Sequence, residues 1–442
     1  MTALLDKIQY FLLTYWNYEE TWRLFFLIFP IVFFIEIPLY SLIVFSYMRK
    51  FWEYVFIPVT TTFYYPDVTC VITCYNEGEA IRLTIESFVE QLYKGNIEIL
   101  VIIDGADVNK KTVEAALSCA KKYERGYGNR YIRIIPKKQR GGRVSSNNLG
   151  LKLAKGEIFI LIDGDCSADN DLIASVVSGF HDKNVIGSSG NIRVRNSRKS
   201  LVTRFQTLEY MIGLQLSKTG LAGLKMLNNI SGAFGIFRKD FVLKMGGWRN
   251  GTAEDLDMTT RIKVYLKQYP ELKIIHSYQA TLHTDVPETW KALLKQRMRW
   301  DGDISYLYFK RYSKLLRPLN VGWRSLFGIF WYDFFFCLCV PFLAIIYVIY
   351  LLVVYSIAFA ATMFIVTYLY YLTTTTMLFT LYILFVSERK RKDMGFVWVI
   401  PLMPLYQFIM RVWTAIATIC EFAISTHKDS RMAPWWVIKK TH

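Results

Sequence analysis

The sequence lacks any pattern that would pair its cysteines. It has seven cysteines among 442 residues and no Cys-x-x-Cys spacing, so we expect reduced thiols rather than a disulfide framework or a zinc site. It contains no Gly-x-Gly-x-x-Gly and no Walker motif, no internal repeat and no low-complexity tract. A nucleotide site, if there is one, must therefore be built from other residues.

Charged side chains are absent from Phe334 to Ser387. At about 20 residues per span, this stretch predicts two membrane crossings joined by a short turn. Leu24 to Met48 carries a single charge, Glu36, and predicts an N-terminal span. It is too long for a signal peptide and no small-residue cleavage site follows it. Prolines and charges interrupt a third apolar block, Phe396 to Ile424, which fits a third span or a re-entrant segment.

The net charge of +17 would ordinarily suggest nucleic acid, but the basic residues cluster beside the apolar blocks. Arg49 and Lys50 follow the first block, and 389–392 follow the charge-free block. Because such clusters concentrate on cytoplasmic faces, we expect a multi-pass protein of the plasma (inner) membrane that contacts lipids and no nucleic acid. The region between the first and second blocks would then lie in the cytoplasm.

That region alternates short apolar runs with amphipathic stretches. Strands are expected at 68–74, 97–103, 131–135 and 158–162, and helices at 81–92, 110–123 and 145–154. This alternation predicts an α/β fold with a parallel, doubly wound, Rossmann-type sheet. In such sheets, ligands bind beyond the carboxyl ends of the strands.

Acidic residues stand at two of those strand ends. Asp104 ends one predicted strand, and Asp163-Gly164-Asp165 ends another. A lone aspartate there is more often a helix cap, but two adjacent carboxylates repel each other unless a cation offsets their charge. Mg²⁺ or Mn²⁺ binds through one or two carboxylates together with substrate phosphates. The pair therefore predicts a divalent cation that holds a nucleotide diphosphate.

Three further features carry weaker signals. Glu254-Asp255-Leu256-Asp257 begins a helix running through Ile262, where Asp257 is explained by the helix dipole. Gly141-Gly142-Arg143 forms a basic turn before a helix and is a candidate phosphate contact. His283 is a candidate extra metal contact, although a lone histidine is more often structural.

Asp104, Asp163-x-Asp165, Glu254-Asp255 and the run Gln296-Arg297-Met298-Arg299-Trp300 occur in this order. In this arrangement the chain resembles the processive, membrane-integrated family 2 glycosyltransferases, the group of poly-N-acetylglucosamine, hyaluronan, chitin and cellulose synthases. The resemblance covers roughly residues 66–310 by motif and the flanking spans by architecture. It implies a GT-A-like glycosyltransferase domain between N-terminal and C-terminal transmembrane helices.

The resemblance also implies roles for individual residues. Asp255 would be the general base, with Glu254 as the alternative, and Asp165 would hold the metal together with Asp163. The remaining roles are as follows: Thr73, Tyr75, Glu77, Asp104, Arg143 and Asp163 for the nucleotide; Gln296 and Arg299 for the leaving diphosphate; Trp300, Ser231 and Gly232 for the acceptor.

The implied activity is inverting, processive transfer from a UDP-sugar, best matched by UDP-N-acetylglucosamine, onto a growing polysaccharide that crosses the membrane. Alternatives are a hyaluronan- or cellulose-type synthase using another UDP-sugar, a ceramide-type lipid glycosyltransferase, or a transport subunit with a vestigial transferase domain. A small membrane accessory subunit is a further candidate partner.

The expected division of the chain follows the apolar blocks. The parts are an N-terminal membrane segment, 1–50, with its span at about 24–48; the cytoplasmic glycosyltransferase domain, 51–304; amphipathic interfacial helices, 305–326; a transmembrane region, 327–427, with two spans at about 329–386 and the third block at 396–424; and a basic cytoplasmic tail, 428–442.

Overall fold

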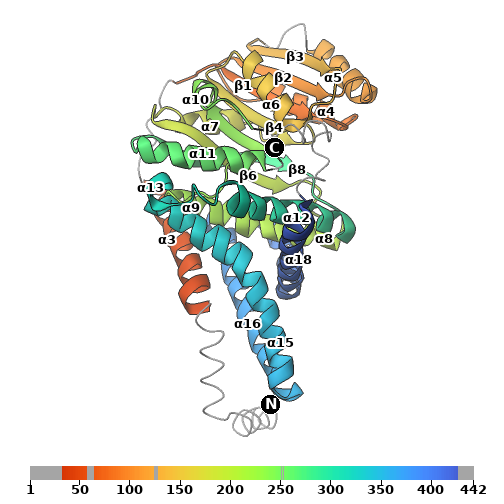
Figure 1. Ribbon diagram of the computed structural model, residues 1–442. Coiled ribbons are helices and arrows are strands. Elements are labelled where there is room, and N and C mark those ends of the chain that lie inside the picture. The colour runs from red at the N-terminus through yellow and green to blue at the C-terminus, as the bar shows by residue number, and fades with distance from the viewer. Residues whose placement is uncertain (1–31, 57–63, 124–127, 250, 252, 427–442) are drawn as a thin grey trace.

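The computed structural model describes residues 32–56, 64–123, 128–249, 251 and 253–426. A sheet domain lies at one end, and α15 (Val340–Val354) and α16 (Ile357–Leu381) extend away from it (Figure 1). Helix α3 (Ile37–Phe56) carries part of the predicted N-terminal span. The start of that span and the predicted tail, 428–442, lie outside the described residues.

One eight-stranded sheet forms the sheet domain, in the order β3-β2-β1-β4-β7-β6-β8-β5. The strands are β1 (Val68–Cys74), β2 (Ile97–Asp104), β3 (Arg130–Lys137), β4 (Ile158–Asp163), β5 (Ser167–Ala168), β6 (Val185–Val194), β7 (Phe234–Arg238) and β8 (Lys273–Thr284). Strands β3, β2, β1 and β4 are parallel, which confirms the predicted α/β class. Strand β7 is antiparallel to β4 and β6, unlike the expected parallel sheet. Strand direction depends on how the chain returns to the sheet, which residue periodicity does not record.

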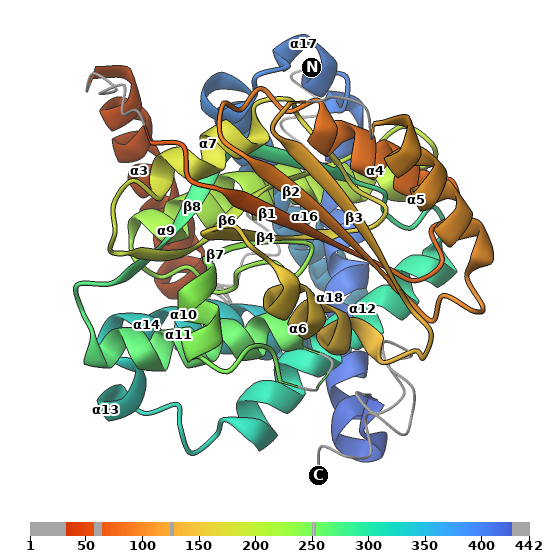
Figure 2. The ribbon, with the colours of Figure 1, turned by 90° about the horizontal axis from the view of Figure 1, so that it is seen from above.

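Helices cover both faces of the parallel strands. Ile72 of β1 packs in the cluster formed with α4 (Ala80–Val89) and α5 (Lys110–Lys122), and its neighbour Val71 packs in the cluster with α6 (Gly142–Leu153). Figure 2 shows α4 and α5 on one side of these strands and α6 on the other. Because both faces are buried, β1 is apolar almost throughout instead of alternating with polar residues.

The strand register brings three predicted site residues to one edge of the sheet. Thr73 of β1 pairs with Asp163 of β4, and Cys74 pairs with Ile103 of β2. Asp104 therefore ends β2 at the level where β1 and β4 also end. The carboxyl ends of three neighbouring strands meet there, as expected for a ligand site in an open α/β sheet.

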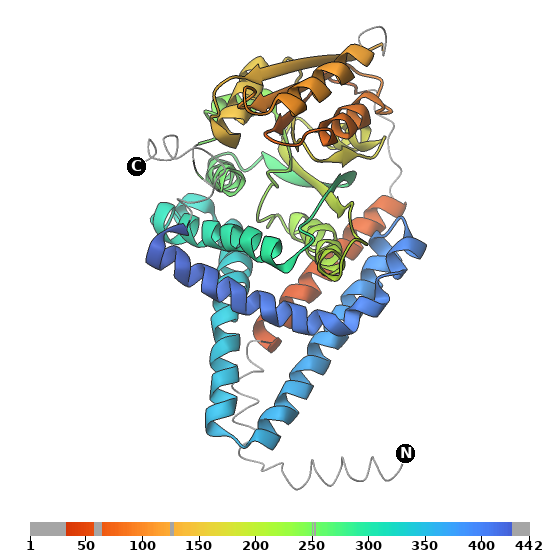
Figure 3. The same ribbon diagram turned by 90° about the vertical axis from the view of Figure 1, so that its right-hand side faces the viewer.

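Three helices among the described residues are long and apolar enough to cross a membrane: Trp323–Val354, Ile357–Val386 and Val397–Ile424. They indicate that the protein associates with a membrane. The first two extend away from the sheet domain, whereas the C-terminal helix α18 (Met403–Ile424), dark blue in Figure 3, runs across beneath it. Helix α18 packs along α12 (Trp290–Tyr306).

The segment expected to form interfacial helices is divided into short pieces. Helix α12 continues as one wide turn, η3 (Leu307–Arg311), and the helical backbone then stops. Two short helices follow, α13 (Pro318–Val321) and α14 (Trp323–Gly328). Pro318 begins α13, and Arg317 before it is extended, because a residue before proline is disfavoured in the helical region.

Candidate active site

Three carboxylates gather at the end of β4. Asp163 and Asp165 flank Gly164, and a Cβ on Gly164 would lie 3.2 Å from Cδ of Glu77, so the turn passes directly over that side chain. Burial, followed by the charges of Asp165 and Asp163, raises the pKa of Glu77 to about 7, although backbone hydrogen bonds lower it. Burial and the charge of Asp163 also raise the pKa of Asp165.

This mutual repulsion suits a hard divalent cation, which would stabilise the ionised forms. Among the described residues, no group of three or more His, Cys, Asp and Glu side chains has the spacing of a complete metal cage. A cation held by Asp163 and Asp165 together with oxygens of a bound ligand stays a prediction. Nε2 of His283 lies 2.9 Å from Oδ1 of Asp169, which favours its structural role over a metal contact.

Asp104 organises the basic turn that sequence patterns predicted as a phosphate contact. Its Oδ1 accepts hydrogen bonds from Nζ of Lys137 (2.7 Å) and the backbone N–H of Gly141 (2.9 Å), and its Oδ2 accepts from the N–H of Gly142 (2.8 Å). Gly142 has φ +80°, which favours glycine because it has no Cβ. The contact of Asp104 with uridine stays a prediction. The hydrogen bonds of Asp104 in the structure hold the start of α6.

Arg143 follows this turn and joins two acidic residues from distant parts of the chain. Its Nη2 lies 2.6 Å from Oδ1 of Asp163, and its Nε lies 2.9 Å from Oε1 of Glu254. Burial is the largest influence on Glu254 and raises its pKa to about 7, although Arg143 lowers it. The guanidinium fork therefore holds the start of α11 (Glu254–Gln268) against the end of β4.

Asp255 is held by the loop that precedes β7. Its Oδ2 accepts hydrogen bonds from Nδ2 of Asn229 (3.0 Å) and the backbone N–H of Gly232 (2.9 Å). A Cβ on Gly232 would lie 3.3 Å from that oxygen, so a side chain there would crowd the carboxylate. Ser231 lies in the same loop, where its carbonyl accepts from the N–H of Phe234 (3.2 Å).

The predicted nucleotide residues of β1 also reach this edge. The carbonyl of Thr73 accepts a hydrogen bond from the N–H of Gly164 (3.0 Å), which fixes the turn between the two aspartates. The ring of Tyr75 lies 4.0 Å from Cζ of Arg140, a cation–π contact beside the glycine turn. An exposed aromatic ring at this edge offers a flat surface to a planar ligand.

Helix α12 carries Gln296, Arg299 and Trp300, whose diphosphate and acceptor contacts remain predictions. Arg297, between them, is structural: its Nη2 lies 2.8 Å from Oε2 of Glu209, and its Cζ lies 4.8 Å from the ring centre of Trp300. Sequence reasoning missed Glu209, because nothing in its local sequence indicates a partner on α12.

Helix α18 anchors α12 from the membrane-associated half. Nε1 of Trp413 donates to the carbonyl of Leu294 (2.8 Å), and the hydroxyl of Thr414 donates to Oδ2 of Asp301 (2.7 Å). The two helices run side by side beneath the sheet domain (Figure 3). The position of α12 therefore depends on residues more than a hundred positions later in the chain.

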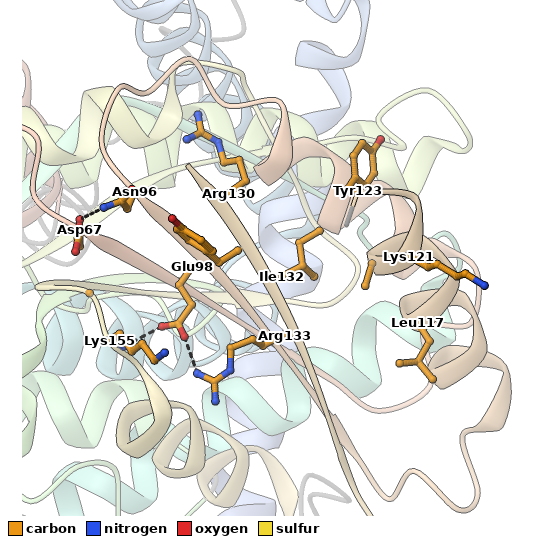
Figure 4. A pocket seen from close by; sticks show the side chains of 13 residues that line it. Asp67, Asn96, Glu98, Leu117, Lys121, Tyr123, Arg130, Ile132, Arg133 and Lys155 are labelled. Atoms are coloured by element: carbon orange, nitrogen blue, oxygen red, sulfur yellow. Dashed lines mark hydrogen bonds and ion pairs between the residues drawn. The ribbon is translucent and has the colours of Figure 1, made fainter. Parts of the chain in front are cut away.

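A hollow of about 850 Å³ lies at the opposite edge of the sheet (Figure 4). Its lining includes Asp67, Asn96, Arg130 and Lys155, which precede or begin β1, β2, β3 and β4. Several guanidinium nitrogens of Arg130 donate to backbone carbonyls, so this side chain is occupied by the fold itself. The hollow is separate from the carboxylates at the other end of these strands.

A curled α/β sheet with an Asp-x-Asp turn after β4 and a carboxylate opening α11 defines a glycosyltransferase of the GT-A-like class. The chain belongs to the glycosyl transferase family group 2, whose family model matches residues 158–424. The model for glycosyl transferase family 2 matches residues 69–242. The resemblance stated from the sequence motifs is thereby confirmed.

Curated relatives include the poly-beta-1,6-N-acetyl-D-glucosamine synthases of Staphylococcus aureus, 31% identical over 236 residues, and Staphylococcus epidermidis, 29% identical over 236 residues. Each match covers 53% of this chain and 53% of the relative, so the chain spans about half the length of these relatives. A mannosyltransferase from Pyrobaculum calidifontis, solved with GDP-mannose and Mn²⁺, has a similar fold, with a TM-score of 0.57 and 16% identity. That similarity covers 88% of this chain and 98% of the other chain.

Proposed function

We propose that this protein transfers a sugar from a UDP-sugar, best matched by UDP-N-acetylglucosamine, onto a growing β-linked polysaccharide, with inversion at the anomeric carbon. The observation that carries the proposal is the convergence of Asp163, Asp165 and Glu77 at the end of β4, joined through Arg143 to the acidic start of α11. The 31% identity to poly-beta-1,6-N-acetyl-D-glucosamine synthases supports the choice of sugar and product.

Asp255 is the proposed general base. It would accept the proton of the acceptor hydroxyl as that oxygen attacks the anomeric carbon and the bond to the diphosphate breaks, which releases UDP. Asp255 lies in the first turn of α11, where its carboxylate accepts hydrogen bonds from Asn229 and Gly232. Glu254 is less suited to this role, because the residue is 5% exposed and its carboxylate pairs with Arg143.

Asp165 and Asp163 would hold Mg²⁺ or Mn²⁺, and the cation would supply positive charge to the departing diphosphate. Gln296 and Arg299 are proposed to contact the same diphosphate, and Trp300 the sugar ring of the acceptor. The mannosyltransferase of similar fold was solved with Mn²⁺, in agreement with a divalent cation. Thr73, Tyr75 and Asp104 are proposed to contact the nucleotide.

We further propose a multi-pass arrangement in the plasma membrane, with the sheet domain in the cytoplasm and the polymer leaving through the membrane-associated half. The basic residues 389–392 support this orientation, because such clusters concentrate on the cytoplasmic face. Lipids would contact α15 and α16, where large apolar side chains such as Val353 and Ile365 are exposed. The boundaries 51–304, 305–326 and 327–427 and a small accessory subunit belong to the same proposal.

Purified full-length protein should be incubated with single radiolabelled UDP-sugars and Mg²⁺ or Mn²⁺, and the product should be separated by size. Long polymer from UDP-N-acetylglucosamine, degraded by a hydrolase specific for its linkage, is the expected result. A labelled glycolipid would instead identify a lipid glycosyltransferase, and polymer from another UDP-sugar would identify another synthase. Asp255→Asn should lower transfer roughly a hundredfold or more, because it removes a positioned base.

A further inference from the structure

The loop from Asn228 to Gly232 fixes the orientation of Asp255. Nδ2 of Asn229 donates to Oδ2 of Asp255 (3.0 Å), and Oδ1 of Asn229 accepts from the hydroxyl of Thr259 (3.2 Å). The hydroxyl of Thr259 also accepts from the backbone N–H of Ile230 (3.0 Å). The single hydroxyl hydrogen of Thr259 has two acceptors in reach, the carbonyl of Asp255 (2.8 Å) and Oδ1 of Asn229 (3.2 Å). The orientation of the Asn229 amide follows from Asp255 itself, because a carboxylate only accepts hydrogen bonds and the amide must present its N–H₂ to it.

Two buried lysines hold the backbone of this loop. Nζ of Lys263 donates to the carbonyl of Asn228 (3.2 Å), and Nζ of Lys218 donates to the carbonyl of Asn229 (3.2 Å). Lys263 is 4% exposed and Lys218 is 8% exposed. Burial lowers the pKa of each lysine to about 8; the negative charges of Asp255 and then Asp333 oppose this shift for Lys218, and that of Asp333 opposes it for Lys263. Two buried cations require a buried anion nearby.

Asp333 supplies that anion from the first apolar helix. It is 4% exposed; its Oδ1 accepts from Nδ2 of Asn228 (3.3 Å), and its Oδ2 accepts from the hydroxyl of Tyr308 (2.6 Å). Asp333 lies inside the apolar helix Trp323–Val354, whose other charged residue, Arg324, stands at its start. Burying a carboxylate at such a position costs free energy unless hydrogen bonds or opposite charges offset it. Residues of this kind are usually functional.

We propose that Asp333 is a positioning residue for sugar transfer, which acts through Asn228 and Asn229 to aim Asp255 at the acceptor hydroxyl. The contacts run from Asp333 in the membrane-associated half to Asn228, and from its neighbour Asn229 to Asp255. It rests on the proposed function, in which Asp255 takes the proton. A movement of the helix Trp323–Val354 would then change the orientation of the Asp255 carboxylate without altering the donor site.

The test uses full-length protein in detergent and compares Asp333→Asn with Asp393→Asn. Asp393 is also a buried aspartate (3% exposed) of the membrane-associated half, but its partners are Ser387 and Tyr382. We expect Asp333→Asn to lower kcat about tenfold to a hundredfold, since small misplacements have effects of that size, with KM for the UDP-sugar changed less than about twofold. Asp393→Asn should leave both constants unchanged.

A double variant tests the path itself. If Asp333 acts through Asn228, then Asp333→Asn combined with Asn228→Ala should lose no more kcat than the more severe single variant. Additive losses, or equal effects of Asp333→Asn and Asp393→Asn, would overturn the proposal. If Asp333→Asn yields no folded protein, Asn228→Ala alone carries the test through the same contrast of kcat and KM.

The variant Asp255→Asn separates the proposed function from the proposed positioning role of Asp333. If it retains activity, the assignment of the base is wrong and the proposed function must be revised. If it is inactive while Asp333→Asn behaves like Asp393→Asn, the base stands and only the positioning role is overturned.

Discussion

The guanidinium of Arg143 bridges Asp163 and Glu254, at 2.6 Å from the first carboxylate and 2.9 Å from the second. It thereby joins the end of β4 to the start of α11, which lie 91 positions apart in the chain. Arg143 therefore links the proposed metal site to the residue that precedes the proposed base, Asp255, whose own carboxylate is held by Asn229 and Gly232.

Arg143→Lys should disrupt this bridge, because an ammonium group cannot reach two carboxylates with the geometry of the guanidinium fork. We expect the rate of transfer to fall about a hundredfold, the lower end of the loss expected for one well-placed electrostatic contact. Arg133→Lys is the matched control, since Arg133 pairs with Glu98 near the opposite edge of the sheet. Equal rates for the two variants would contradict the bridging role.

Divalent cations should be required for activity. Asp165→Asn removes one of the two proposed carboxylate ligands, so we expect the cation concentration for half-maximal activity to rise at least about tenfold. Asp107→Asn changes an exposed aspartate after β2 and should have no effect. Full activity of the unaltered protein in excess chelator would refute the cation requirement.

Glu254 should make stability depend on pH. Its pKa is raised to about 7 in the folded protein from 4.5, so between these values the folded state binds more protons than the unfolded state. The free energy of unfolding should therefore fall as pH rises from about 4.5 to 7, by at most about 3 kcal/mol from this group.

Glu254→Gln removes this titration. Its thermal midpoint, measured in detergent with chelator present, should match that of the unaltered protein below pH 5 and exceed it above pH 7. Parallel midpoint curves across this range would show that Glu254 ionises normally.

Trp413→Phe should shorten the polymer. It removes the hydrogen bond from α18 to the carbonyl of Leu294, which helps to hold α12 and its Trp300 beneath the sheet domain. We expect shorter chains on sizing gels, because Trp300 is the proposed acceptor contact, and a higher KM for the UDP-sugar, because Gln296 and Arg299 on the same helix are proposed to contact its diphosphate. Trp323→Phe, at an exposed tryptophan, is the control and should leave chain length as it is.

Local patterns were sufficient for the parallel half of the sheet, whereas the roles of the candidate site residues stay predictions. The strand at 68–74 was predicted with the observed bounds of β1, because apolar runs bounded by polar residues mark strands buried on both faces. Asp163 and Asp165 were found because two carboxylates at a strand end have few structural explanations. Asp257 was explained by the helix dipole alone, whereas the structure adds Arg261 at 2.9 Å and Tyr312 at 2.6 Å.

The sequence by itself determined the α/β class, the apolar helices and the family, because these depend on periodicity, composition and motif order. Only the tertiary structure decided that β7 runs antiparallel, that Arg143 joins Asp163 to Glu254, and that Asp333 reaches the loop beside Asp255. Each of these depends on residues that are distant in the chain, and the local sequence around a residue does not indicate its partner. Such contacts arise when the packed sheet and helices bring buried charges together, where each must find an opposite charge or a hydrogen bond.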